Sequence, residues 1–326
     1  MKLTTINNQT RDGQLVVVNR AGTRAVSVPQ IANTMQQALD NWEAVAPQLN
    51  TVYHHLNDEG LNDAFDLKLN DVLAPLPRAL QFLDGSAYLA HVERVRRARG
   101  AEMPPSFLED PLMYQAVSDG FLSHNQDIEV VSEEYGIDFE AEAAVITSDV
   151  PMHVSADQAG QYIQLICILN DVSLRNLIPA ELAKSFGFLQ SKPRTALSPF
   201  FVTPDELGDA WQNNKIHLPM RTWLNGEWFG EPNCGVDMQF DFAQLIAHAA
   251  KTRPLCAGTI IGSGTIANQD MTKGSTCLAE KRVLEVIADG KASTPFMSFG
   301  DEVKIEVTDK NGRNVFGTIH QKIVKY

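Results

Sequence analysis

The chain has 326 residues, of which 44% are hydrophobic and 21% are charged, and its formal net charge at pH 7 is −13. These proportions are typical of a globular protein with a sizeable core, and the length allows two domains. The negative charge argues against a nucleic acid or an anionic membrane surface as the partner.

The sequence shows no sign of export or membrane insertion. Residues 1–8 contain no apolar run of the signal-peptide kind, and no stretch approaches the roughly 18 apolar residues of a membrane span. The four cysteines lie far apart, without C-x-x-C spacing, which indicates reduced thiols and no zinc knuckle. We therefore expect a cytoplasmic protein. The cysteines are Cys167, Cys234, Cys256 and Cys277.

Residues 1–77 are predicted to form a small N-terminal domain. Short β-like runs come first, and the apolar residues between Thr34 and Leu56 then recur at helical spacing. No catalytic constellation occurs in this region. Two prolines in residues 72–77 mark the crossing into the main domain, residues 78–326.

The first candidate site residues of the main domain are Asp84 and His91. Asp84 is a plausible N-cap of a helix that stops at Gly100, and in such a helix Asp84 and His91 share one face, two turns apart. A capping aspartate and a solvated histidine would give the same pattern. The segment from Gly100 to Ser118 is predicted to be a long irregular loop, which carries Tyr114; such loops are often functional.

Residues 137–146 alternate between apolar and acidic side chains, which predicts a strand with one buried face. Glu140 and Glu142 then share the other face at a spacing of about 6.6–7 Å, close enough to converge on one point. Converging carboxylates repel each other unless one is protonated or a cation lies between them. The apolar flanks favour a cation, although a solvated acidic edge has the same pattern.

A second carboxylate follows the next apolar run. Residues 162–169 end abruptly at Asn170-Asp171, which places Asp171 at the rim of the core, where ligands are presented. A strand-ending turn is the alternative, since Asn-Asp also favours turns. The cations Arg175 and Lys192 come next, and each alone would be interpreted as a surface residue.

The later elements are predicted from local signals. Asn225-Gly226 is a strong signal for a two-residue β-hairpin, and residues 242–250 predict a helix. Residues 259–266 predict an apolar strand that enters a glycine turn close to a ligand. Because G-x-G-x-x-G is absent there, we exclude a dinucleotide site.

Together these segments resemble the fumarylacetoacetate hydrolase family, in order from about residue 80 to about residue 285. Residues 137–146 resemble its E-x-E strand, residues 168–175 its N-D-x-S-x-R segment, and residues 263–265 its S-G-T turn. The resemblance implies an α+β fold, mostly β. The expected protein has a small barrel-like N-terminal domain followed by a larger domain of mixed β-sheets (a β-roll). The resemblance also implies a homodimer.

The resemblance also implies a metal centre. In that family four carboxylates hold a divalent ion, and they correspond here to Asp84, Glu140, Glu142 and Asp171. Oxygen ligands alone suit Mg²⁺, Ca²⁺ or Mn²⁺ and not zinc. His91 matches the catalytic histidine of the family, and Glu280 matches the glutamate that orients and polarises it.

The implied reaction is hydrolytic carbon–carbon cleavage of a β-diketo acid, with fumarylacetoacetate as the expected substrate in tyrosine breakdown. His91, paired with Glu280, would take a proton from the attacking water. Lys192 would stabilise the departing enolate, and Arg175 an oxyanion or a substrate carboxylate. Three further residues are candidate contacts to the substrate: Tyr114, Thr195 and Thr265.

One residue departs from the pattern of the family. Where its longer members have a glutamine three residues after the arginine, this chain has Ile178, with Gln190 as a candidate replacement. The alternatives are therefore other family reactions: acylpyruvate hydrolysis, oxaloacetate decarboxylation, or the hydration and isomerisation of dienoates. An alternative of another class is a non-catalytic calcium-binding or scaffold protein whose carboxylates only stabilise the fold.

Overall fold

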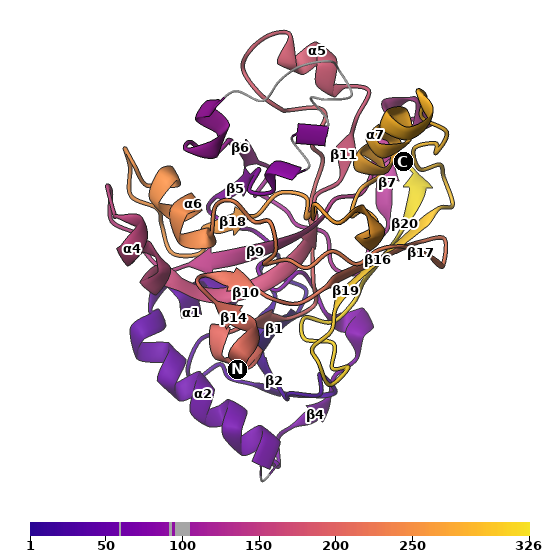
Figure 1. Ribbon diagram of the computed structural model, residues 1–326. Helices are drawn as coiled ribbons and strands as arrows, with labels where there is room; N and C mark the ends of the chain where they lie inside the picture. The colour runs from indigo at the N-terminus through magenta and orange to yellow at the C-terminus, as the bar shows by residue number, and fades with distance from the viewer. Residues whose placement is uncertain (59, 91–92, 95–104) are drawn as a thin grey trace.

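The computed structural model describes residues 1–58, 60–90, 93–94 and 105–326. Strands cross the middle of the molecule, α1 (Met35–Asp40) and α2 (Trp42–Asp58) lie at one end, and α5 (Ile178–Leu182) lies at the other (Figure 1). The expected class, α+β and mostly β with mixed sheets, is confirmed. No helix in these ranges is both long and apolar enough to cross a membrane.

An eleven-stranded sheet forms the centre of the molecule, in the order β4-β3-β2-β1-β13-β10-β9-β18-β5-β6, with β12 also paired to β10. The β18–β5 pair is parallel and β18–β9 is antiparallel, so β18 joins segments far apart in the sequence. The strands are β1 (Lys2–Ile6), β2 (Gln14–Val18), β3 (Arg24–Ser27), β4 (Phe65–Asp66), β5 (Phe82–Gly85), β6 (Met113–Ala116), β9 (Ala141–Thr147), β10 (Ile163–Asn170), β12 (Ala196–Leu197), β13 (Phe201–Val202) and β18 (Ile260–Gly262).

A second sheet of five strands has the order β17-β16-β19-β20-β7, and two pairs of short strands lie beside the sheets, β11–β8 and β14–β15. The β20–β7 pair is parallel. These strands are β7 (Ile128–Val130), β8 (Ile137–Asp138), β11 (Ser173–Leu174), β14 (Trp211–Gln212), β15 (Lys215–Ile216), β16 (Met220–Leu224), β17 (Glu227–Gly230), β19 (Glu302–Val307) and β20 (Ile319–Lys325).

Further helices lie within the described ranges of the chain. The α-helices are α4 (Ala156–Ala159), α6 (Phe242–Ala249) and α7 (Leu278–Asp289). The 3-10 helices are η1 (Leu69–Asp71), η2 (Pro105–Leu108), η3 (Glu133–Tyr135), η4 (Gly160–Tyr162), η5 (Pro204–Ala210) and η6 (Met271–Lys273).

The elements with local signals form as predicted. The Thr34 side chain caps α1 by accepting from the Gln37 amide at 3.2 Å, and α2 continues the predicted helical stretch. Asn225 and Gly226 link β16 to β17 with φ values of 51° and 81°, the left-handed conformations that a type I′ turn requires.

The core joins the N-terminal strands to the rest of the chain. β1 pairs with β13, and Leu3 lies opposite Phe201. One apolar cluster contains Leu3, Leu15 and Leu39 from the N-terminal region together with Leu165 and other residues of β9, β10 and β18. The N-terminal region therefore buries its apolar residues against the main sheet.

Three local expectations were wrong. Asp84 lies in β5 and caps no helix, and Tyr114 lies in β6, paired with β5, where an irregular loop was expected. The acidic strand is interrupted between β8 and β9, and β9 is buried along its whole length because apolar clusters cover both of its faces. Long-range strand pairing explains these differences, since a short sequence window does not contain it.

Candidate metal centre

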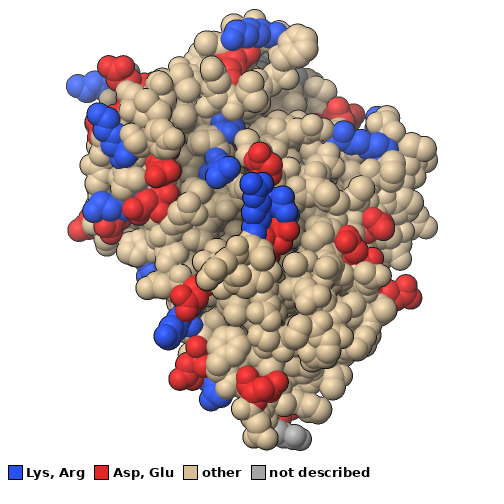
Figure 2. All heavy atoms as spheres, turned by 180° about the vertical axis from the view of Figure 1, so that it is seen from behind, with Lys and Arg blue, Asp and Glu red and all other residues tan. Residues whose placement is uncertain are grey.

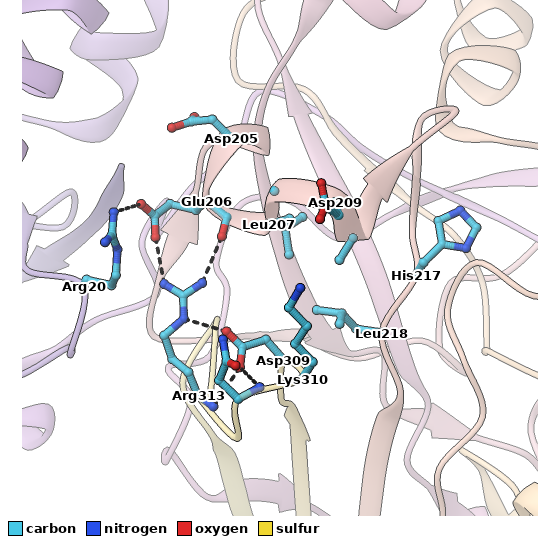
Figure 3. Close-up of a pocket in the computed structure, with 13 residues that line it drawn as sticks. Arg20, Asp205, Glu206, Leu207, Asp209, His217, Leu218, Asp309, Lys310 and Arg313 are labelled. Atoms are coloured by element: carbon cyan, nitrogen blue, oxygen red, sulfur yellow. Dashed lines mark hydrogen bonds and ion pairs between the residues drawn. The ribbon is translucent and has the colours of Figure 1, made fainter.

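Two cavities differ in the chemistry of their walls. The larger, about 680 Å³, lies between η5, Arg20 and the β19–β20 connection (Figure 3). Its arginines are already paired: Arg313 contacts Glu206 at 3.1 Å and Asp309 at 3.0 Å, and Arg20 lies 3.6 Å from Glu206. Among the described residues, no three acidic, histidine or cysteine side chains of its wall bring ligand atoms within 4.8 Å of one another.

The smaller cavity, about 190 Å³, is lined by three of the four predicted carboxylates, those of Asp84, Glu140 and Glu142. Asp84, Glu142 and Asp171 each offer a carboxylate oxygen within 4.8 Å of the others, and all three residues are buried. Neighbouring strands bring them together, because β5 pairs with β18, β18 with β9, and β9 with β10, which Asp171 directly follows. A Cβ atom at Gly262 would collide with the Asp84 carboxylate, so the glycine leaves room for it.

Burial and mutual repulsion act on the carboxylates of this cluster. Neither carboxylate oxygen of Glu142 has a hydrogen-bond partner in the described part of the chain, and the residue is 0% exposed. Burial and the carboxylates of Asp84 and Asp171 raise the pKa of Glu142 well above its ordinary value. Burial, followed by the charge of Asp171, raises the pKa of Asp84 to about 7. A buried carboxylate without partners is costly, and a cation removes that cost.

The donor set fits a hard divalent cation. All three clustered side chains offer oxygen, which suits Mg²⁺, Ca²⁺ or Mn²⁺. Asp84 is held in place because its Oδ1 accepts from the Gly264 amide at 3.1 Å. Asp171 is braced because its Oδ1 accepts from the Thr195 hydroxyl at 2.6 Å and its Oδ2 accepts from the Tyr114 hydroxyl. Thr195, predicted to contact the substrate, thus contacts Asp171, one of the residues predicted to coordinate the metal.

Glu140, the fourth predicted ligand, lies at the edge of this cluster and contacts both predicted cations. Its Oε1 accepts from Arg175 Nη2 at 2.6 Å, and its Oε2 accepts from Lys192 Nζ. Lys192 Nζ also donates to Asp171 Oδ2 at 2.6 Å. Although burial opposes the charged form of Lys192, the carboxylates of Asp171 and Glu140 raise its pKa above the ordinary value. Both cations line the same cavity as the carboxylates, as do Tyr114 and Thr265.

Glu280 is 0% exposed near the start of α7 and forms an ion pair with Arg94. Arg94 also donates to the carbonyl oxygen of Asn268 at 2.6 Å, which fixes its position. Burial raises the pKa of Glu280 to about 7, and the charge of Arg94 opposes that rise. His91, the predicted partner of Glu280, lies outside the described residues.

Two residues that support the site were not predicted. Asp138 is fully buried; its carboxylate accepts from the amides of Leu278 and Ala279, at 2.7 and 2.9 Å, and from Arg175 Nε at 2.8 Å. It therefore links α7 to the cation side of the cavity. Its place two residues before Glu140 in the acidic strand was the available signal. For Arg94, which pairs with Glu280, no sequence signal exists because 186 positions separate the two.

Comparison with known proteins places the chain in a family. Residues 81–324 match the family described as fumarylacetoacetate (FAA) hydrolase C-terminal, and residues 1–78 match fumarylacetoacetase N-terminal domain 2. The chain belongs to the fumarylacetoacetate hydrolase family. The resemblance predicted from the sequence motifs is therefore confirmed.

Curated relatives of this family differ in reaction. The oxaloacetate tautomerase of Bacillus subtilis is 27% identical over 230 residues, which cover 69% of this chain and 72% of that protein. The fumarylacetoacetase of Oryza sativa subsp. japonica is 25% identical over 218 residues, 58% of this chain and 51% of that protein. This chain thus aligns with only about half of the plant enzyme.

The fold is also found in solved structures. The maleylpyruvate hydrolase of Sphingobium sp. SYK-6, solved in complex with manganese(II) ion and pyruvate, superposes with a TM-score of 0.65 at 15% identity. The superposition covers 100% of this chain and 99% of that one. At this identity the likeness concerns the fold.

Proposed function

We propose that this protein is a metal-dependent hydrolase that cleaves a carbon–carbon bond in a β-diketo acid. The observation that carries the proposal is the cluster of three buried carboxylates, with Glu142 unpartnered, beside a cavity that Lys192 and Arg175 also line. A purely structural cation site has no use for two buried cations beside it. A hydrolase does, because negative charge develops on the substrate.

The residues proposed to hold the cation are Asp84, Glu142 and Asp171, with Glu140 as the fourth ligand. Mn²⁺ and Mg²⁺ are the preferred candidates, followed by Ca²⁺, and the manganese complex of the maleylpyruvate hydrolase supports this choice. When bound, the cation acts as a Lewis acid for the oxygens of the diketo acid.

The roles of the chain's own residues follow from the charge changes in hydrolysis. Water adds its oxygen to the carbonyl carbon, the carbon–carbon bond breaks, and its electron pair leaves as an enolate that later takes up a proton. Lys192, fixed by Glu140 and Asp171, is placed to stabilise this enolate. Arg175 is placed for the oxyanion, and His91, oriented by Glu280, is the proposed base that deprotonates the water.

The fumarylacetoacetase and maleylpyruvate hydrolase among the similar proteins support a β-diketo acid as the substrate, and fumarylacetoacetate is the first compound to test. A second candidate is the tautomerisation of oxaloacetate, favoured by the tautomerase as a relative at 27% identity. Both candidates require the same metal centre and differ in whether a carbon–carbon bond breaks.

The test measures turnover and metal binding in two lysine variants. We expect EDTA-treated protein with Mg²⁺ or Mn²⁺ restored to cleave a β-diketo acid into two carboxylic acids. Lys192→Met should lower turnover about a hundred- to a thousandfold while still binding Mn²⁺. Lys184→Met, which removes an exposed lysine nearby, is the matched control and should match the wild type. Equal turnover in the two variants would remove Lys192 from the mechanism, and products without bond cleavage would favour the oxaloacetate candidate.

A further inference from the structure

Arg175 and Lys192, the two cations of the cavity, stand at the two ends of one loop. The residue before Arg175 is Leu174, and its amide donates to the carbonyl oxygen of Ser191 at 2.8 Å. Ser191 is the residue before Lys192. The chain between the two ends contains α5 and residues 183–190. The relative position of the two cations therefore depends on how this loop is closed.

The Arg175 end of the loop is fixed by another segment of the chain. The Arg175 amide donates to the carbonyl oxygen of Gly136 at 2.8 Å. The Asn176 amide donates to the carbonyl oxygen of Tyr135 at 2.9 Å, and the Asn176 side chain donates to that of Glu134 at 2.8 Å. These three carbonyl groups directly precede β8, so the Arg175 end is held from outside the loop.

The Lys192 end is held from inside the loop, by the carboxylate of Glu181 on α5. Its Oε1 accepts from the amides of Leu189 and Gln190, at 3.0 and 2.6 Å, and its Oε2 accepts from the amide and the hydroxyl of Ser191. Glu181 is buried, and Ser191 is fully buried. Both oxygens of this carboxylate thus tether three consecutive residues, of which the last directly precedes Lys192.

The segment that carries Lys192 is fixed at both of its ends. The tether holds Ser191, and the Thr195 hydroxyl donates to Asp171 Oδ1 at 2.6 Å. Between these anchors, Lys192 Nζ donates to Asp171 Oδ2 at 2.6 Å and to Glu140 Oε2. Release of the Ser191 anchor would therefore move the ammonium group relative to the carboxylates. A misplacement of about 1 Å can cost about a hundredfold in rate.

We propose that Glu181 is a positioning residue, which sets the place of the Lys192 ammonium group without touching the substrate. Glu181 itself lies outside the described wall of the cavity. The inference rests on the proposed function, because Lys192 is the group proposed to stabilise the enolate. Since Arg175 is held from outside the loop, loss of the tether displaces Lys192 and leaves Arg175 in place.

A double-mutant cycle tests the proposal on the manganese-loaded full-length protein. Glu181→Gln should lower kcat about tenfold for the β-diketo acid that the wild type cleaves, less than the loss from a full 1 Å misplacement. In a Lys192→Met background the same change should leave kcat unaltered, because the group that it positions is gone. A further tenfold loss in that background would overturn the proposal.

Two more variants distinguish positioning from a general loosening of the fold. Ser191→Ala removes the hydroxyl that donates to Glu181 Oε2 and should also lower kcat, by less than Glu181→Gln. In an Arg175→Lys background Glu181→Gln should keep its full effect, since Arg175 is held by residues outside the loop. If the effect vanished in that background too, the tether would not act through Lys192 and the proposal would fail.

Binding of oxalate separates this inference from the proposed reaction. Oxalate is a dianion that resembles the enolate of a 2-oxo acid, and calorimetry measures its affinity without turnover. Glu181→Gln should weaken oxalate binding about tenfold in the wild-type background and have no effect in the Lys192→Met background. This pattern without cleavage of any diketo acid would refute the hydrolase proposal and support the positioning role. Cleavage with equal effects of Glu181→Gln in both backgrounds would refute the positioning role and leave the hydrolase proposal standing.

Discussion

At the scale of single residues, a substitution of Glu142 can distinguish a carboxylate that serves metal binding from one that serves folding. Glu142→Gln replaces an unpartnered buried carboxylate with a neutral group of the same shape, so the metal-free protein should become more stable. The wild type should gain about 2.7 kcal/mol from Mn²⁺ at a hundred times its dissociation constant, which raises its Tm by a few degrees. The variant should gain nothing. Thermal unfolding with EDTA and with Mn²⁺ measures both effects.

Asp138→Asn is the contrasting control. Its carboxylate is equally buried but fully bonded, to two α7 amides and Arg175. An asparagine there directs an NH₂ group at a donor, which leaves buried groups unsatisfied and costs about 1–3 kcal/mol each. The Asp138→Asn variant should have a lower Tm than the wild type, both with and without metal. If Glu142→Gln behaves like Asp138→Asn, the carboxylates of the cluster are not arranged for a cation.

Glu280 should make stability depend on pH. Burial raises its pKa to about 7 from an ordinary 4.5. The folded protein therefore holds this proton more tightly than the unfolded chain. Its stabilising contribution is full below pH 4.5 and is lost as pH rises to about 7. The unfolding free energy of wild type minus that of Glu280→Gln should thus fall over this window, by at most about 1.4 kcal/mol per pH unit, and then level off.

Urea unfolding between pH 5 and 8 measures this difference. Glu285→Gln, on the same helix, is the matched control. Although burial opposes it, hydrogen bonds from Thr294 and Ser293 lower the pKa of Glu285 to about 2, so its contribution changes only in more acidic solution. A constant difference for Glu280→Gln over the whole range would mean that Glu280 is ionised throughout.

The residues of the site were predictable to unequal degrees. The acidic alternation placed Glu142 in a strand and predicted a cation, and the structure brings Glu142 together with Asp84 and Asp171. The contacts of Glu140 with Arg175 and Lys192 depend on the break between β8 and β9, for which the alternating sequence has no signal.

At the scale of elements, the loop that follows Glu181 is expected to control substrate affinity. Glu181→Gln removes one acceptor and places an NH₂ group near the Ser191 amide, and each lost hydrogen bond to a charged group is worth about 1.5–3 kcal/mol. We expect faster hydrogen exchange at the amides of residues 189–191 and a KM about tenfold higher, a factor that corresponds to about 1.4 kcal/mol.

Glu285 provides a matched control for this prediction too. It closes a loop in the same way, accepting from the amides of Ser293 and Thr294 at 2.7 and 2.9 Å, and it does not line the cavity. Glu285→Gln should speed exchange locally and leave KM unchanged. An unchanged KM in Glu181→Gln would show that the tether does not position the cavity wall.

Elements with local causes were predicted, whereas those that depend on distant partners were not. The Asn225-Gly226 hairpin and α6 follow from turn chemistry and apolar spacing within a few residues. Asp84 looked like a helix cap because capping is a local pattern. In the structure its segment pairs with β18, about 180 residues later, and that pairing decides its conformation.

At the scale of the whole molecule, the sequence indicated two regions but not how they join. The division at residues 77 and 78 followed from composition and stays a prediction. The strand pairing of β1 with β13 and the apolar cluster shared by both regions depend on contacts more than 100 residues apart. Figure 2 shows acidic and basic side chains interspersed on one face of the molecule.

Because the regions share one core, we expect the chain to unfold as a single cooperative unit. Tyr53 on α2 adds a polar link, since its hydroxyl donates to the buried carboxylate of Glu206 at 2.6 Å. Tyr53→Phe should cost about 1–3 kcal/mol by leaving that acceptor short of a partner. If the regions are coupled, the loss lowers the one transition as a whole, with equal calorimetric and van't Hoff enthalpies. If they were independent, scanning calorimetry would resolve two transitions and Tyr53→Phe would shift them unequally. The fragment 78–326 would then also fold alone, although its face of the shared cluster would be exposed to water.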